Sequence, residues 1–514
     1  MKWHKTLSVA MIAAFALGAS ACDDGLAELN ENPNAPTDVP AQYLLPQAIQ
    51  STVEQFYGHW FNLEFAGLFT QHWAKIQYLD EDLYELRPAT IDGWWTTLYA
   101  SSLKDWQTII EKGQESAVFV NHEATGRTMK AFTGHIMTDI WGDIPWSEAL
   151  RGDAEEPETT PAYDAQADVY AALVGELDAA LGLFDPAART WGSEDLLFGG
   201  DIEGWMRFAN SLKLRLAVRA SDVAPAQATT WINEVLAHPA GLILDNADNA
   251  SLEFLSAAPN QNPLFENWFG GRDDHAVSST LINMLAALND PRLPVYAEPA
   301  ANDSVEMGGH VVYEGEVYRG MTNGTPEEDV PPINTMSRIG HHWRGPGSQG
   351  ATTPAYLLTA AEVRFLLAEV AQQGLVAAPL GQTAAQHYNA GVTASLEMWD
   401  GADGVSITAT DITTYLAQPG VVYDGSLERI IEQKWIALYT NGPEAYAEVR
   451  RTGFPDEVQA REAHAYAFVP GRVPYPDVEQ SLNRAEWQAA IAAQPDNDGT
   501  YTGTIWWDTT PQTQ

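Results

Sequence analysis

The sequence predicts a mostly α-helical protein whose helices support long irregular loops. Four segments place their apolar residues on one helical face, at residues 164–184, 205–216, 363–370 and 430–438. Stretches rich in Gly, Pro, Asn and Asp separate them, at 257–274, 298–354 and 463–476. Because 45% of the residues are apolar and 10% aromatic, the chain can bury a large core.

The first 21 residues have the three zones of an export signal. A basic start is followed by a mostly apolar stretch at 7–17, which is too short to span a bilayer, and then by small residues up to Cys22. Cys22 is the only cysteine, so the chain forms no internal disulfide. We predict that residues 1–21 are removed as a signal peptide.

Cys22 has two interpretations. Ala19 to Ala21 fit an ordinary A-x-A cleavage site, which would make the thiol behind it incidental. The segment also resembles a bacterial lipobox, although Ala19 stands where such motifs usually carry leucine. A sole cysteine at the cleavage point favours lipidation of Cys22.

Residues 22–46 are expected to form an extended tether, because three prolines at 33, 36 and 40 disfavour helix there. No later segment approaches the ~20 apolar residues of a transmembrane helix. We therefore expect residues 47–514 to fold as one soluble domain.

The charge balance is strongly acidic. The chain has 27 Lys and Arg against 69 Asp and Glu, for a formal net charge of −42. A surface of this kind repels nucleic acid and anionic lipid headgroups, so neither is an expected partner.

Motifs for cofactors and catalysis are incomplete. Residues 345–350 spell G-x-G-x-x-G, but no strand is predicted before them, so a flexible loop is the better interpretation. Ser348 lacks the glycine two positions earlier that a nucleophile elbow requires. His341 and His342 have no companion ligands in a metal motif. We predict no metal and no cofactor, whereas a pair of carboxylates acting on a glycosidic bond stays open as an alternative.

Aromatic side chains give the best indication of a ligand. The chain has 18 tryptophans, and sugar rings stack their apolar C–H faces on aromatic planes while polar neighbours bond the hydroxyls. Tryptophans next to Arg, Asp and Gly in loops are therefore candidates for ligand contact, although each could equally be a loop anchor in the core. The candidates are Trp73, Trp268, Arg272, Asp273, Trp343 and Arg344.

A series of motifs in a fixed order resembles the SusD/RagB family of outer-membrane lipoproteins. They are E-N-P-N (31–34), T-D-I-W-G-D-I-P-W-S-E-A-L (138–150), F-A-N-S-L-K-L-R-L (208–216), N-D-P-R (289–292), A-E-V-R-F-L-L-A-E (361–369), E-Q-K-W (432–435) and R-R-T-G-F-P (450–455). The charged residues in and beside these motifs lie near apolar helical faces, where buried ion pairs would fix helix packing. We expect this structural role for Asp139, Asp143, Arg215, Arg219, Glu362 and Glu369.

The resemblance implies a scaffold of tetratricopeptide-like helix pairs with ligand loops on one face. It also implies a surface-exposed, lipid-anchored protein of the outer membrane. Such a protein captures an oligosaccharide or a peptide and delivers it to a SusC-like TonB-dependent transporter, without acting as an enzyme. Two rivals are an extracellular glycan-degrading lipoprotein and a purely structural surface protein.

Overall fold

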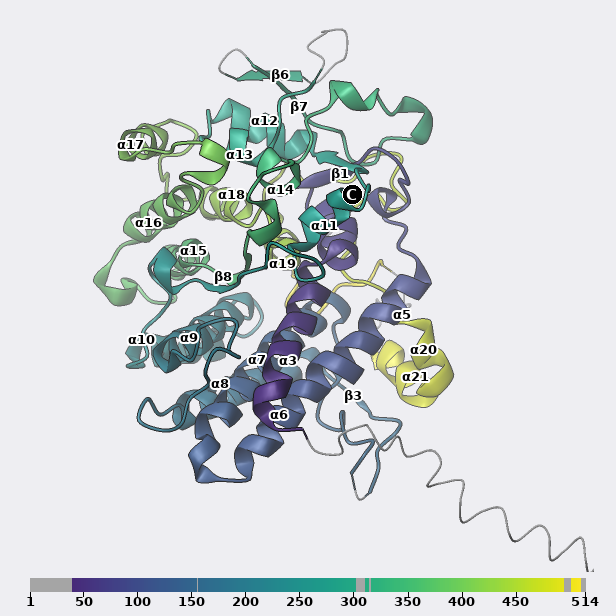
Figure 1. Ribbon diagram of the computed structural model, residues 1–514, viewed down its shortest axis with the longest axis vertical. Helices are drawn as coiled ribbons and strands as arrows, with labels where there is room; N and C mark the ends of the chain where they lie inside the picture. Colours follow the sequence, from purple (N-terminus) through teal and green to yellow (C-terminus); the bar gives the residue numbers. More distant parts are fainter. Residues whose placement is uncertain (1–38, 155, 302–309, 314–315, 494–500, 510–514) are drawn as a thin grey trace, which may run out of the picture.

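In the computed structural model, helices stack along one side of the molecule while shorter helices and irregular segments cover the other (Figure 1). The structure describes residues 39–154, 156–301, 310–313, 316–493 and 501–509. The predicted signal peptide, Cys22 and most of the predicted tether lie outside these residues. No helix in the described ranges is long and apolar enough to cross a membrane.

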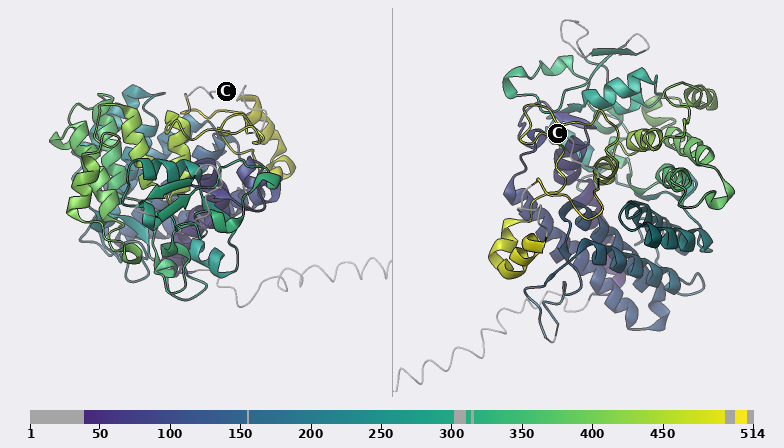
Figure 2. Two further views of the ribbon diagram at one scale, coloured as in Figure 1. Left: turned by 90° about the horizontal axis from the view of Figure 1, so that it is seen from above. Right: turned by 180° about the vertical axis from the view of Figure 1, so that it is seen from behind.

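The stack is formed by helices that pack against their neighbours in the chain, as the views from front and back both show (Figures 1 and 2). Its members are α6 (Lys104–Gln114), α7 (Val120–Trp141), α8 (Gln166–Leu183), α9 (Ile202–Arg219), α10 (Pro225–Ala237), α15 (Ala360–Gln372), α16 (Ala384–Glu397), α17 (Ala409–Leu416), α18 (Leu427–Ala437) and α19 (Gly442–Thr452). Helices α8, α9, α15 and α18 are the four predicted from apolar periodicity. The predicted mostly helical fold is confirmed.

The remaining elements surround this stack. The helices are α3 (Ala41–Tyr57), η1 (His59–Ala66), α4 (Gly67–Phe69), α5 (Pro88–Thr97), η3 (Leu98–Leu103), α11 (Pro263–Phe269), α12 (Ser279–Ala287), α13 (Leu293–Tyr296), α14 (His341–Arg344), α20 (Asp477–Leu482) and α21 (Arg484–Ala493). Single 3₁₀ turns are η2 (Glu81–Leu83), η4 (Ala117–Phe119), η5 (Asn246–Asp248), η6 (Glu327–Asp329), η7 (Ile333–Thr335), η8 (Gly350–Thr352), η9 (Pro379–Gly381) and η10 (Ala402–Gly404).

The described strands pair into four two-stranded antiparallel ribbons. These join β1 (Trp73–Lys75) to β5 (His275–Val277), β2 (Ile144–Pro145) to β3 (Tyr163–Asp164), β4 (Ala250–Leu252) to β8 (Ala355–Leu358) and β6 (His310–Tyr313) to β7 (Glu316–Arg319). In the first ribbon Trp73 lies opposite Val277 and Lys75 opposite His275. That register brings the segments before β5 and after β1 to the same end of the ribbon.

Helix α3 begins inside the segment expected to be an extended tether. Pro40 precedes the first turn with φ −55°, which is compatible with starting a helix, and Pro46 lies within it. The helix buries Leu45, Ile49 and Val53 in the core. Residues 41–46, which were expected to be extended, are therefore helical in the structure.

Buried ion pairs join the central helices of the stack. Arg215 on α9 bonds Glu362 on α15 through two contacts of 2.7 and 2.8 Å. Arg219 pairs with Asp139 on α7 and with Glu444 on α19. These side chains are almost fully buried, so each charge depends on its partners.

The other two charged residues that were expected to form buried ion pairs have different partners. Glu369 pairs with Arg451, at 2.7 and 2.9 Å. Among the described residues Asp143 has no ion-pair partner, and it accepts the backbone N–H of Gln166 at 2.8 Å. It therefore satisfies a free N–H at the start of α8, which corrects the ion-pair prediction for this residue.

Two predicted loop stretches contain short elements. Residues 257–274 include α11, whose first turn is capped by the side chain of Asn262. The G-x-G-x-x-G segment at 345–350 follows α14 rather than a strand. This arrangement lacks the strand that a dinucleotide site requires.

Candidate functional site

Exposed aromatic rings gather where η1, the loop after β1 and α11 meet. Trp60 is 44% exposed, Tyr78 57% and Phe269 71%, while Trp268 is half-buried. We call these four residues the aromatic surface. Large rings exposed to this extent are unusual in a chain that buries most of its tryptophans, and they indicate a binding surface.

A stretch of π-helix positions Trp60. In η1 the backbone is wound more widely than in an α-helix, and it buries Phe61 to Ala66 while leaving the Trp60 ring at the surface. Wide helical turns of this kind occur frequently at functional sites. Helix α11, which carries Trp268 and Phe269, packs directly on η1.

A groove of about 410 Å³ lies beside Trp60, between the end of α3, η1 and α5. Its walls include Glu54, His59 and Trp94. The His59 Nδ1 and Trp94 Nε1 atoms are buried without a hydrogen-bond partner in the described structure. The groove thus combines an aromatic face with an open volume of ligand size.

Arginines flank the aromatic rings. The Arg87 guanidinium lies 5.4 Å from the Trp60 ring centre, and the Arg272 guanidinium lies 5.0 Å from that of Tyr78. Arg272 is also held by Asp274 at 2.6 Å, although its side chain stays 51% exposed. Each pair presents a ring face next to N–H donors, which is the combination that binds a sugar ring and its hydroxyls.

A buried ionic cluster supports this surface from below. One Glu64 oxygen contacts the Lys75 ammonium, and the other lies 3.3 Å from His59 Nε2 and 3.4 Å from His275 Nε2. Lys75 also bonds Glu81 at 2.9 Å. In the part of the chain that is described, no group of three or more His, Cys, Asp or Glu side chains is arranged to hold a metal ion. Because Glu64 lies on η1, Lys75 on β1 and His275 on β5, the cluster fixes η1 to the β1–β5 ribbon.

Burial sets the protonation of this cluster. It raises the pKa of Glu64 to about 7, against the opposing pull of Lys75. Burial, together with the charges of Lys75 and Arg272, lowers the pKa of His59 to about 4. Neutral His59 is consequently the form next to Trp60 at pH 7, and it can exchange hydrogen bonds with a hydroxyl without a charge penalty.

The structure brings five of the six predicted site residues around one small pocket. Trp268, Arg272, Asp273, Trp343 and Arg344 all line it. Its volume is about 20 Å³, which is room for about one water molecule and not for a sugar. Asp273 accepts Arg344 at 2.8 Å, and Arg344 also donates to Glu298 at 2.6 Å. These polar side chains brace the loops behind the aromatic surface.

Trp73 and Trp343 occupy the position of loop anchors. Both are buried, at 0% and 1% exposure. Trp73 donates its indole N–H to the Tyr439 hydroxyl at 2.9 Å, and the Trp343 ring packs 5.4 Å from the same tyrosine ring. Neither ring presents a face to solvent, whereas Arg272 is exposed, Trp268 is half-buried and the Asp273 side chain is 38% exposed.

Trp60, Tyr78 and Phe269 were not among the predicted site residues. Trp60 lies in an apolar segment that indicates a core helix, and only the packing of η1 reveals which position faces solvent. Tyr78 could have been noticed from the sequence because it lies among polar residues, in Gln77-Tyr78-Leu79-Asp80, shortly after β1. Phe269 adjoins the predicted Trp268, so its neighbourhood was recognised although the residue itself was not.

Comparison with known proteins decides the family. Residues 33–476 match a SusD-like family described as "Starch-binding associating with outer membrane". The chain belongs to the SusD-like family. The match covers the whole helical stack and the aromatic surface, and the family's description associates it with the outer membrane and with carbohydrate.

Solved structures with the same fold include proteins described as binding proteins. One, a chitin-binding protein, is 29% identical, with a TM-score of 0.79 over 92% of this chain and 100% of that one. A chitin-binding SusD homologue from Flavobacterium johnsoniae is 23% identical, with a TM-score of 0.75 over 91% and 100%. A SusD homologue from Bacteroides vulgatus is 24% identical, with a TM-score of 0.76 over 91% and 98%. No curated protein sequence matches the chain.

Proposed function

We propose that this SusD-like protein captures an oligosaccharide on the aromatic surface, with the groove beside Trp60 as the main subsite. The observation that carries the proposal is the combination of exposed ring faces with flanking arginines beside an open groove. Sugar rings need an apolar face for their C–H groups and donors and acceptors for their hydroxyls. A peptide needs fewer stacking faces, so a glycan is the better-matched ligand.

The class of glycan is suggested by the relatives. One solved neighbour at 29% identity is described as chitin-binding, and the family description names starch. We propose a neutral oligosaccharide of one of these two types. Both have repeated ring faces, and Trp60, Tyr78 and Phe269 offer several separate rings for them.

We further propose that binding occurs without turnover. A glycosidase needs two carboxyl groups flanking the bond, one of them with a raised pKa. Glu64 and Asp82 have pKa values raised to about 7, but both are 2% exposed and bonded to internal partners. Their positions suit a structural role beneath the aromatic surface.

The membrane attachment and the partner are part of the same proposal. Lipidation of Cys22 would place the protein on the outer face of the outer membrane, where a SusC-like TonB-dependent transporter would receive the ligand. Mass spectrometry of the protein from its native membrane tests the first step. A diacyl mass on Cys22 supports it, and a free thiol contradicts it.

The binding experiment is a calorimetric titration of the full chain with N-acetylglucosamine oligomers, maltooligosaccharides and short peptides, followed by chromatography of each sample. We expect saturable heat with one glycan series and recovery of intact ligand. Released shorter sugars would establish the glycan-degrading alternative. Binding of peptides alone would contradict the oligosaccharide proposal.

A further inference from the structure

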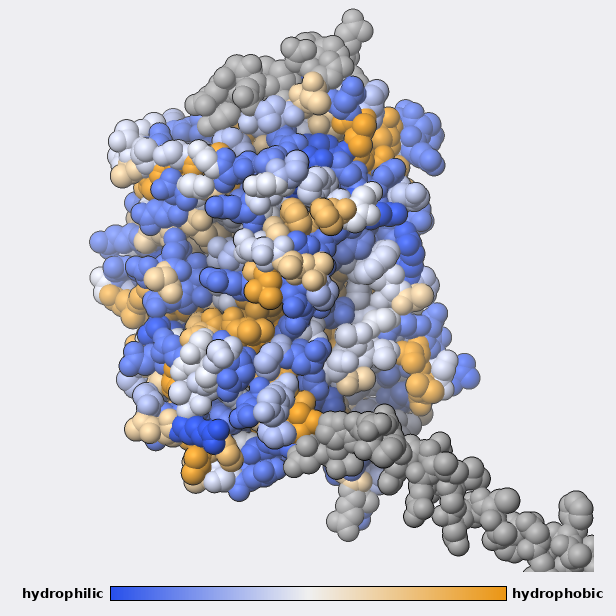
Figure 3. All heavy atoms as spheres, in the orientation of Figure 1, coloured by the Kyte–Doolittle hydropathy of each residue, from blue (hydrophilic) through white to orange (hydrophobic). Residues whose placement is uncertain are grey.

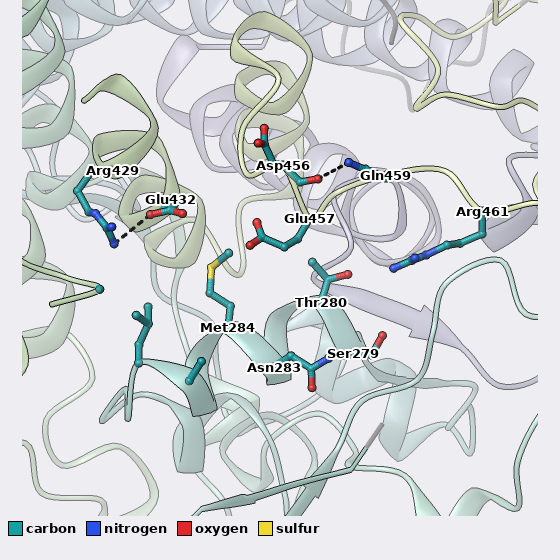
Figure 4. A pocket seen from close by; sticks show the side chains of 13 residues that line it. Ser279, Thr280, Asn283, Met284, Arg429, Glu432, Asp456, Glu457, Gln459 and Arg461 are labelled. Carbon is teal, nitrogen blue, oxygen red and sulfur yellow. Dashed lines mark hydrogen bonds and ion pairs between the residues drawn. The ribbon is translucent and has the colours of Figure 1, made fainter. Parts of the chain in front are cut away.

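A second cavity, separate from the aromatic surface, lies between α12, α18 and the segment after α19 (Figure 4). Its volume is about 500 Å³, which is within the range of small-molecule sites. Helix α12 provides the floor, with Thr280, Asn283 and Met284, and residues 456–461 form the opposite wall. Among the described residues no aromatic ring lines it, which distinguishes it from the aromatic surface.

Two carboxylates dominate one end of this cavity. Glu432 on α18 pairs with Arg429 at 3.2 Å. Glu457 has no hydrogen-bond or ion-pair partner among the described residues, and Figure 4 shows its carboxylate turned toward the space above Met284. Glu457 is exposed and Glu432 half-buried, so a ligand entering from solvent would meet both.

The charges at this end remain incompletely neutralised. Burial raises the pKa of Glu432, the Arg429 charge opposes that rise, and the charges of Glu428 and Glu457 add to it. Arg429 also pairs with Asp424 at 3.8 Å, so its charge is shared between Glu432 and Asp424. A cationic group placed between Glu432 and Glu457 would be attracted by both and would relieve their mutual repulsion.

The walls of the cavity are held in place by a buried glutamine. Gln71, which is 1% exposed, accepts the Thr280 hydroxyl at 2.5 Å and donates to the Gln459 carbonyl at 2.7 Å. One side chain thus joins the floor to the opposite wall. A cavity whose walls are fixed in this way loses little entropy when a ligand binds.

The other walls define the size and shape of the ligand. Met284, Ala287 and Leu288 give an apolar patch, while Asn283 offers an amide. Arg461 lies across the cavity from Glu432, as Figure 4 shows. The lining therefore suits a small, polar ligand with an aliphatic or sugar skeleton.

We propose that this cavity is a second binding site that takes a primary ammonium group, held between Glu432 and Glu457. Two sources carry that chemistry, an amino sugar with a free amine and the amino terminus of a short peptide. N-acetylation removes the charge in either ligand. The site is independent of the proposed glycan site, because it shares no residue with the aromatic surface.

The test is calorimetry on the full chain with four probes: a glucosamine tetramer, its N-acetylated counterpart, triglycine and N-acetyl-triglycine. We expect at least one free-amine probe to bind, and its affinity to fall at least about tenfold in Glu457→Gln. Glu462→Gln is the matched control, because it removes the same charge from the same segment outside the cavity lining. That control should change affinity less than about twofold.

The four probes also separate the sources and the two sites. Binding of the glucosamine tetramer alone identifies an amino sugar, and binding of triglycine alone identifies a peptide amine. Trp60→Ala should weaken N-acetylated sugars and leave the effect of Glu457→Gln on the free-amine probe intact. Absence of heat from both free-amine probes, or equal weakening by Glu457→Gln and Glu462→Gln, overturns the proposal without affecting the glycan site.

Discussion

Replacing Arg215 with methionine tests whether the buried charges hold the helical stack together. The Arg215 guanidinium makes two contacts with Glu362, at 2.7 and 2.8 Å, donates to the Leu357 carbonyl at 2.8 Å and lies 3.4 Å from Glu444. Its removal leaves Glu362 buried without its guanidinium partner. We expect Arg215→Met to lower the free energy of unfolding by about 3–5 kcal/mol, a large share of the stability of an ordinary domain.

The assay is urea unfolding followed by tryptophan fluorescence and circular dichroism. Arg207→Met is the matched control on the same helix, because Arg207 pairs with Asp248 at 3.2 Å at the surface and should cost no more than about 1 kcal/mol. A double replacement, Arg215→Met with Glu362→Met, should be less destabilised than Arg215→Met alone. Equal costs for Arg215→Met and Arg207→Met would refute the reasoning.

Three further predictions concern protonation, capping and packing. Burial lowers the pKa of His72 to about 3. As the pH falls, His72 is therefore protonated in the unfolded chain before it is protonated in the folded chain, and stability is lost below about pH 6.5. By pH 4 this one group should cost on the order of 3 kcal/mol, and a pH series of unfolding curves should be flatter for His72→Gln. Asp143→Ala should lower stability by about 1 kcal/mol in urea unfolding, because the Gln166 N–H loses its acceptor, and an unchanged midpoint would contradict that role. In thermal scans Gly67→Ala should lower the Tm, because its methyl group would overlap the Trp73 ring. Gly175 on α8 has open space around it, so Gly175→Ala should raise the Tm. A change of Tm in the same direction for both variants would contradict the packing described here.

The helical stack was largely predictable from the sequence because it depends on local periodicity. Apolar residues at helical spacing over 164–184 and 363–370 correspond to α8 and α15, whose buried faces are the predicted ones. Arg215 and Glu362 were also recognised as structural, since each lies on an apolar helical face where only a paired charge is tolerated. Asp143 was misassigned because a cap and an ion pair look alike in sequence.

The binding surface was less predictable because exposure is a tertiary property. Trp60 lies in a largely apolar segment and Trp343 stands between His342 and Arg344, yet the packing of η1 leaves the first exposed and the packing of α14 buries the second. The segment around Trp268 and Arg272 was predicted as a loop with aromatic and charged residues, whereas Trp268 lies on the short helix α11. The contact between Arg272 and Tyr78 depends on the pairing of β1 with β5. These two strands lie about 200 residues apart in the chain, so the sequence alone does not reveal their pairing.

The central claim is that exposed aromatic rings on this surface bind the glycan. The most direct measurement compares the affinity of the full chain, Trp60→Ala and Tyr43→Ala for the glycan that gives the strongest heat. Tyr43 is the matched control, because it is 67% exposed on α3 and lies outside both the aromatic surface and the groove lining. We expect at least about tenfold weaker binding for Trp60→Ala and no change for Tyr43→Ala. Unchanged affinity in Trp60→Ala, with both variants folded, would contradict it.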